Sequence, residues 1–191
     1  TTSVLGADVL DPPGSLTARR TCVMSSPTLR SVSQATATAT TVTVARPVGV
    51  LPGDALIAIV MHHDSTSDPV AGVAGGWGMQ VPSHSSAGGE ALMVLKIATA
   101  TEPASYTFSG LDPSDATAVV MLAYTGVDPA TPLAANPVGQ ANASGSTIQA
   151  ASVTTDRAGA TLVTAFLADD YASTISVPAG TERYWTLDIT R

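Results

Sequence analysis

The most hydrophobic stretches of this chain are short and end abruptly. They are ALIAIVM at 55–61, ALMVLKIA at 91–98 and AVVMLAY at 118–124. Each run holds about seven residues between Gly, Pro or Asp, and this length favours a strand over a helix, which needs ten residues or more. After AVVMLAY, Gly126 permits a sharp turn while Pro129 and Pro132 remove amide donors, so neither sheet nor helix can continue. The runs therefore predict buried strands separated by turns.

Other segments carry the alternation of half-buried strands. In TTVTVAR at 40–46 valines alternate with threonines, and in SYTFS at 105–109 Tyr106 and Phe108 share one face. VLPGD at 50–54 is typical of a turn. Further strands are predicted at 161–168 (TLVTAFLA) and, more weakly, at 147–154, 174–178 and 183–189. About seven to nine strands without a convincing helix predict an all-β fold, an antiparallel β-sandwich.

The beginning of the chain lacks this pattern. Residues 1–34 have no sustained period of two or 3.6, and Pro12-Pro13-Gly14 interrupts them early. We therefore predict an extended N-terminal arm or linker over 1–34, with one short strand at most, and a β-sandwich domain over 35–191. The full length of 191 residues is sufficient for one domain with a substantial core.

The charge of the chain argues against several classes of partner. Fifteen acidic and eight basic residues give a formal net charge of -7, and the basic residues are scattered apart from Arg19-Arg20. Such a surface gives little electrostatic reason to bind nucleic acid or anionic lipid. No apolar run approaches the roughly 18 residues that span a bilayer, so membrane insertion is not expected. The lone Cys22 cannot form an internal disulfide and is expected to be a structural thiol.

The polar clusters of the sequence do not predict a catalytic or metal site. HHDSTSD at 62–68 is best explained as a solvated loop after strand 55–61, because an extended backbone separates His62 and Asp64 from His63. The spacing to His84 matches no familiar metal signature, although a functional cluster is the weaker alternative. No serine stands in a GxSxG elbow, and GVAGGWG lacks the lysine of a phosphate loop. We predict no catalytic residue, no cofactor and no metal, and a protein that is not an enzyme.

Two sets of residues are candidates for contacts with a ligand or a partner. Trp77 is expected to cap the sandwich or anchor a loop, and sugar stacking is the alternative for Trp77, Tyr171 and Trp185. Pro129 and Pro132 belong to a long connection, residues 126–146, without periodicity of its own. Such a connection is unusual in a compact domain, so we expect it to pack over a sheet edge or contact a partner.

The order of these segments resembles a known module. The succession is VGVLPGDALIAIV, GGWGM, LKIATATEPASYTFSG, AVVMLAYTGVDPATPL, SVTTDRAGATLVTAFLA and VPAGTERY, which covers about residues 40–184. It resembles the β-sandwich module of tail and other virion proteins of phages that infect actinobacteria, and of related bacterial surface proteins. The resemblance implies a jelly-roll-like structural or adhesive module, and it brings no catalytic residues. Modules of this kind carry further strands after PAGTERY, so we expect the gene product to continue beyond Arg191 or a neighbouring subunit to complete the sheet.

Two functions therefore stand as expectations. The first is a non-enzymatic virion structural protein, a tail or capsid-decorating subunit, whose partners are other virion proteins and copies of itself. The alternative is a carbohydrate-binding or adhesive module of a tail fibre or bacterial cell surface, or a secreted one, whose partner is a host surface glycan.

Overall fold

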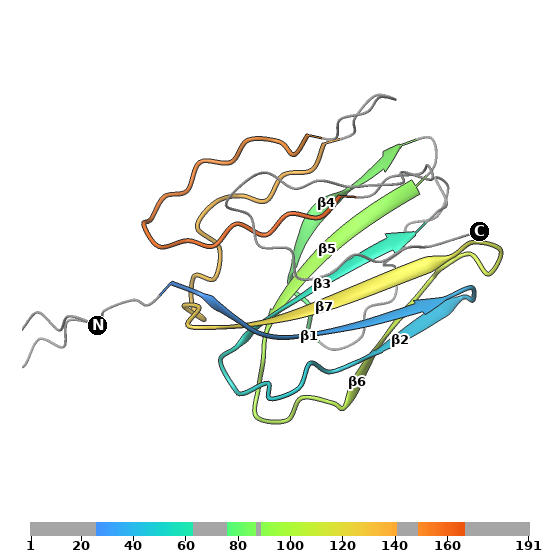
Figure 1. The fold of residues 1–191 in the computed structure, drawn as a ribbon, viewed down its shortest axis with the longest axis horizontal. Helices are drawn as coiled ribbons and strands as arrows, with labels where there is room; N and C mark the ends of the chain where they lie inside the picture. The colour runs from blue at the N-terminus through green and yellow to red at the C-terminus, as the bar shows by residue number, and fades with distance from the viewer. Residues whose placement is uncertain (1–25, 63–75, 87–88, 141–148, 167–191) are drawn as a thin grey trace, which may run out of the picture.

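A computed structural model of the chain describes residues 26–62, 76–86, 89–140 and 149–166 (Figure 1). These residues contain no helix and seven strands, which are β1 (Thr28–Ala37), β2 (Thr41–Ala45), β3 (Ala55–His62), β4 (Met79–Ser86), β5 (Gly89–Ile97), β6 (Ser105–Ser109) and β7 (Thr117–Thr125). They form a five-stranded sheet of order β1-β7-β3-β5-β4 and a two-stranded sheet, β2-β6. Every ladder between them is antiparallel. The prediction of an all-β fold with antiparallel sheets is confirmed.

The five strands predicted from apolar runs or alternation within 40–125 are present as β2, β3, β5, β6 and β7. Two further strands are present: β4 was not predicted, and β1 begins within residues 1–34, where one short strand at most was expected. β4 contains Pro82 and a register shift between Val81 and His84, and it ends the sheet, a place where a missing amide donor is tolerated. β1 pairs with β7 over nearly its whole length.

β1 also changes the predicted domain boundary. A break after residue 34 would cut through this strand, so residues 28–34 belong to the five-stranded sheet and not to an arm. The cause of the error is that β1 is polar, with exposed and half-buried positions mixed along it, so hydrophobic periodicity does not reveal it. Residues 1–25 of the predicted arm lie outside the described residues.

The prediction of a core strand at 161–168 is wrong for its described part. Residues 161–166 belong to no strand, and Leu162 is 69% exposed. A strand requires a partner as well as a suitable side-chain pattern, and this segment pairs with none in a ladder. Residues 149–154 are likewise irregular, and the candidates at 174–178 and 183–189 lie outside the described residues.

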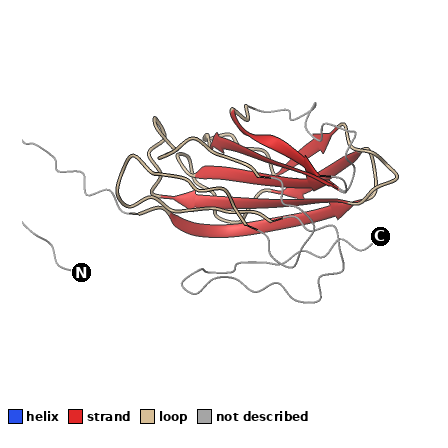
Figure 2. Cartoon of the chain, turned by 90° about the horizontal axis from the view of Figure 1, so that it is seen from above, coloured by secondary structure: helices blue, strands red, loops and turns tan. Residues whose placement is uncertain are grey.

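One hydrophobic cluster joins the two sheets. Val42 and Val44 of β2 and Tyr106 and Phe108 of β6 point into it, because alternate residues of a strand share one face. The five-stranded sheet contributes alternate residues of β3, β5 and β7, which are Leu56, Ala58, Val60, Leu92, Val94, Val119, Met121 and Ala123. Figure 2 shows the strands gathered in the middle of the molecule, with loops at both ends.

A second cluster covers the opposite face of the five-stranded sheet. Ile59, Val120 and Leu122 lie in it, so nearly every residue of β3 and β7 is buried on one face or the other. Because both faces of these strands are buried, their sequences are continuous apolar runs in which apolar and polar residues do not alternate. Val127 and Val163, from the two irregular segments after β7, pack against this cluster.

Hydrogen bonds tie these two segments together. The Asp156 amide donates to the Ala134 carbonyl (2.8 Å), and the Arg157 guanidinium donates to the carbonyls of Thr131 (2.9 Å) and Leu133 (3.0 Å). The described part of the long connection, residues 126–140, is thus held against the rest of the chain. Its contact with a partner stays a prediction.

Candidate functional site

The residues predicted for ligand contact do not come together within the described residues. Trp77 precedes β4 and is half-buried, with its ring 5.5 Å from Tyr106 and 6.0 Å from Phe108 between centroids. Pro129 is exposed and Pro132 half-buried in the connection after β7. Tyr171, Trp185, Cys22 and His63 lie outside the described residues, and for His84 only the backbone is described.

Trp77 packs against the cluster shared by the two sheets and therefore covers part of its margin. Its contact with Tyr106 is edge to face, the arrangement that aromatic pairs prefer. The indole Nε1 is buried and has no acceptor among the described residues. The ring thus acts as part of the core, as expected for a residue that caps it.

The densest polar cluster lies next to this tryptophan and centres on Glu102. Its carboxylate accepts hydrogen bonds from Lys96 Nζ (2.9 Å), the Tyr106 hydroxyl (2.5 Å), and both the amide (2.8 Å) and hydroxyl (3.0 Å) of Thr99. Arg46 donates to the Glu102 carbonyl at 2.7 Å. The side chains of Lys96 and Glu102 are 9% and 2% exposed, so this ion pair is largely removed from water.

The electrostatics of the cluster follow from these contacts. Burial alone would raise the pKa of the Glu102 carboxyl, but the hydrogen bonds from Lys96, Tyr106 and Thr99 outweigh it and lower that pKa to about 2. Burial, together with the hydrogen bond and negative charge of Glu102, raises the pKa of the Tyr106 hydroxyl. At neutral pH the carboxylate is therefore ionised and the phenol protonated.

This arrangement is suited to holding the fold rather than to chemistry on a substrate. A carboxylate offers about four acceptor sites, and the four donors around Glu102 occupy them. A phenol with a raised pKa is a poor general base near neutral pH. The cluster joins β5, β6 and the loop between them, and Arg46 adds the residue that follows β2.

The sequence carries one signal for this cluster. Lys96 is the only charged residue in ALMVLKIA. A cation inside a buried strand needs a counter-ion nearby, because burying an unpaired charge is costly. The partner could not be named, since Glu102 reaches Lys96 only through the turn between β5 and β6.

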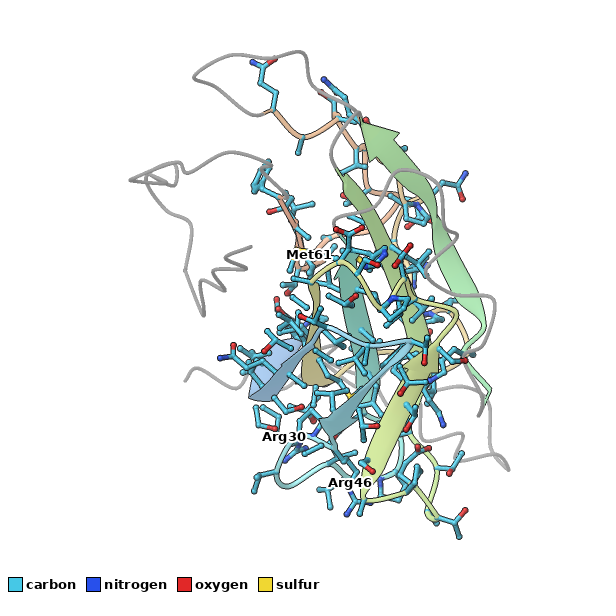
Figure 3. The ribbon with its side chains drawn as sticks, turned by 90° about the vertical axis from the view of Figure 1, so that its right-hand side faces the viewer. Arg30, Arg46 and Met61 are labelled. Carbon is cyan, nitrogen blue, oxygen red and sulfur yellow. The ribbon has the colours of Figure 1, made fainter. Side chains whose placement is uncertain are left out.

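A second ion pair fixes the loop between β2 and β3. Asp54 accepts hydrogen bonds from Arg30 Nε (2.7 Å) and Nη2 (3.2 Å) in β1, and from the Leu51 amide (2.8 Å). The Asp54 amide donates back to the Leu51 carbonyl at 3.1 Å, so the predicted turn at 50–54 is confirmed. Figure 3 shows Arg30 and Arg46 at one end of the sheets, away from Met61 near the far end of β3.

The Asp54→Asn variant is expected to lose about 2 kcal/mol of unfolding free energy, because two charge-assisted hydrogen bonds are weakened and a buried amide faces donors. Urea unfolding at neutral pH measures the change. Asp156→Asn is the matched control: its ion pair with Arg157 is exposed and should contribute less than about 0.5 kcal/mol. Equal losses in the two variants would contradict the structural role of Asp54.

The placement of His62 corrects the prediction of a solvated loop. His62 is the last residue of β3 and is fully buried. The Asp112 amide donates to its Nε2 (3.4 Å), so in the neutral imidazole Nδ1 carries the proton and donates it to the Thr117 hydroxyl (2.7 Å). The histidine thereby joins the end of β3 to the start of β7 and to the loop before it. The rest of HHDSTSD, residues 63–68, lies outside the described residues.

The described residues show no sign of a metal site or of a membrane-spanning helix. In the described part of the chain, no three His, Cys, Asp or Glu side chains are grouped so that they could hold a metal ion. None of the described segments forms an apolar helix long enough to span a membrane. Comparisons with models of protein families, with curated proteins and with solved structures find no match. The resemblance to virion modules therefore stays a prediction.

Proposed function

We propose that this chain is a non-enzymatic structural subunit of a phage virion, a tail or capsid-decorating protein. In this proposal the two antiparallel sheets form a jelly-roll-like β-sandwich that serves as a rigid body. Other virion proteins and copies of the chain bind to it through the N-terminal arm and the connection after β7.

The observation that carries the proposal is that the buried polar side chains bind to other residues of the same chain. Glu102, Asp54 and His62 are each engaged by neighbours of the same chain, and each of them joins strands or loops to one another. Groups occupied in this way contribute to rigidity, whereas catalysis needs a group that can exchange a proton or meet a substrate. The resemblance of residues 40–184 to virion modules supports the same function.

Immunogold electron microscopy tests this proposal. Antibodies against the purified chain should label intact virions at regular positions, on the tail or on the capsid surface. An antibody to an unrelated protein of the same culture is the control. Labelling of the bacterial surface with unlabelled virions would contradict the proposal and favour the adhesive module, which a glycan-binding assay would then examine.

A further inference from the structure

The five-stranded sheet has an apolar face that points away from β2 and β6. The strand registers align its residues in four rows that cross β1, β7, β3 and β5. All of these residues but Gln34 and Thr36 belong to the second hydrophobic cluster or pack against it. We call this continuous surface the outer face. Counted from the start of β1, its rows are Leu29-Tyr124-Ala55-Ile97, Val32-Leu122-Ile57-Leu95, Gln34-Val120-Ile59-Met93 and Thr36-Ala118-Met61-Ala91.

The outer face is buried as deeply in its third and fourth rows as in its first two. Val120 and Ala118 of β7 are fully buried, and Ile59 of β3 is 1% exposed. Neighbours within a sheet cover the sides of a side chain, whereas burial of its tip requires a second layer on that face. Atoms from outside the sheet therefore lie over these two rows.

The described hydrophobic residues that cover the outer face from outside the sheet, Val127 and Val163, both lie at its first row. Val127 follows the end of β7, which pairs with the start of β1. Val163 follows Thr161, whose hydroxyl donates to the carbonyl of Pro27 (3.1 Å) just before β1. Because a strand advances about 3.4 Å per residue, the third and fourth rows lie about 13 and 20 Å beyond the first. They are too far away for either valine to cover them.

The chain that continues from Val163 is long enough to reach the far rows. Phe166, the last described residue of this segment, is 39% exposed, and residues 167–191 follow it. An extended segment crosses about 20 Å in roughly six residues. Residues 167–191 can therefore cross the whole outer face from the end where Val163 lies.

One part of this segment also matches the outer face in its pattern. In RYWTLDI at 183–189, Trp185, Leu187 and Ile189 alternate with more polar residues. In an extended segment these three side chains point the same way at intervals of about 6.8 Å, which is also the spacing of the rows. The three side chains therefore fit three successive rows.

The other long segments outside the described residues lack this pattern. In residues 1–25 the large apolar residues stand side by side, as in Val4-Leu5 and Val9-Leu10, so an extended backbone would point them to opposite sides. Residues 63–75 and 141–148 are mostly small or polar. The pattern thus favours 183–189 as the segment that covers the far rows.

We propose that residues 183–189 lie extended over β7 and β3 on the outer face of the same chain, with Trp185, Leu187 and Ile189 against its rows. The inference goes beyond the proposed function and does not depend on it. The segment adds a third layer to the two sheets and keeps the outer face from contact with other proteins. Subunits of an assembly then meet the chain elsewhere.

A double-mutant cycle in the full chain tests the inference. Val119 and Val120 are fully buried neighbours in β7, but Val119 belongs to the cluster between the sheets and Val120 lies on the outer face. Val120→Ala and Leu187→Ala together should shift the unfolding equilibrium constant, measured in urea, at least about threefold less than the product of their separate shifts. Val119→Ala is the matched control, and its shift should multiply with that of Leu187→Ala to within about twofold.

Trp185 gives a second readout, which decides the inference if a double variant fails to fold. Trp77→Phe leaves Trp185 as the single tryptophan of the chain. In the folded protein acrylamide should quench Trp185 severalfold less than in the urea-unfolded chain. Val120→Ala should also shift the emission of Trp185, whereas Val119→Ala should not.

Several outcomes would overturn the inference. They are separate effects that simply multiply at Val120, coupling of Leu187 with Val119 instead, and a Trp185 as accessible to acrylamide in the folded chain as in the unfolded one. Coupling of Val120 with Leu10→Ala and not with Leu187→Ala would assign the cover to the N-terminal residues. Coupling that disappears on dilution would assign it to a second copy, and either of these results also contradicts the proposal.

Discussion

Replacing Phe108 with alanine is expected to lower the free energy of unfolding by about 3–5 kcal/mol, enough to unfold a marginal domain. Phe108 is fully buried in the cluster that joins the two sheets, and its ring lies 6.0 Å from that of Trp77. The loss combines the transfer free energy of the aromatic ring with the cost of the cavity left between the sheets. Chemical denaturation at neutral pH, followed by tryptophan fluorescence, measures it.

The control for this prediction is Leu162→Ala. The sequence placed both residues in core strands, whereas the structure buries Phe108 and leaves Leu162 69% exposed. We therefore expect Leu162→Ala to change the free energy of unfolding by less than about 0.5 kcal/mol. A loss at Leu162 as large as that at Phe108 would mean that residues 161–166 belong to the core, contrary to the structure described above.

Glu102→Gln is expected to lower the free energy of unfolding by about 3 kcal/mol. The substitution leaves the buried Lys96 ammonium without a counter-ion and turns an amide toward hydrogen-bond donors. The double variant Glu102→Gln with Lys96→Met should recover part of the loss, since both charges are then removed. Urea unfolding of the wild type, the two single variants and the double variant gives the coupling free energy between Glu102 and Lys96. A coupling free energy near zero would show that the ion pair does not contribute to stability.

The same carboxylate predicts how stability depends on pH. Its pKa falls from 4.5 in the unfolded chain to about 2 in the folded protein. A depressed pKa contributes stability that is fully present above the unfolded value and is lost as the pH falls through the folded one. We therefore expect the wild type to lose up to about 3 kcal/mol between about pH 5 and pH 2 through this group. The Glu102→Gln variant should lose correspondingly less unfolding free energy over the same pH range. Equal losses in the variant and the wild type would contradict the assignment of this pH dependence to Glu102.

The strands that could be predicted from the sequence are those whose burial is visible in their own pattern of apolar residues. β3 and β7 are buried on both faces and consist mainly of continuous apolar residues. β2 and β6 face the core on one side only, so buried and exposed residues alternate along them. β1 and β4 were missed because each lies at an end of the five-stranded sheet, where polar residues and Pro82 are tolerated.

The remaining errors concern contacts between residues distant in the sequence. Residues 161–166 have the pattern of a strand, but no local feature reveals whether a strand finds a neighbour to pair with. The burial of His62 depends on Thr117 and Asp112, which follow it by 55 and 50 residues. The donors around Glu102, by contrast, lie three to six residues from it, and the turn between β5 and β6 brings them together.

Quantitative mass spectrometry of purified virions tests the central claim, that this chain is a structural subunit of a virion, most directly. Particles from the culture that produces the chain would be purified by two independent methods, and its peptides compared with those of the major capsid protein. The account predicts a fixed ratio of the two proteins in both preparations and through further washing. Recovery of the chain in the cell-surface or secreted fraction, with a ratio in particles that falls toward zero on purification, would contradict it.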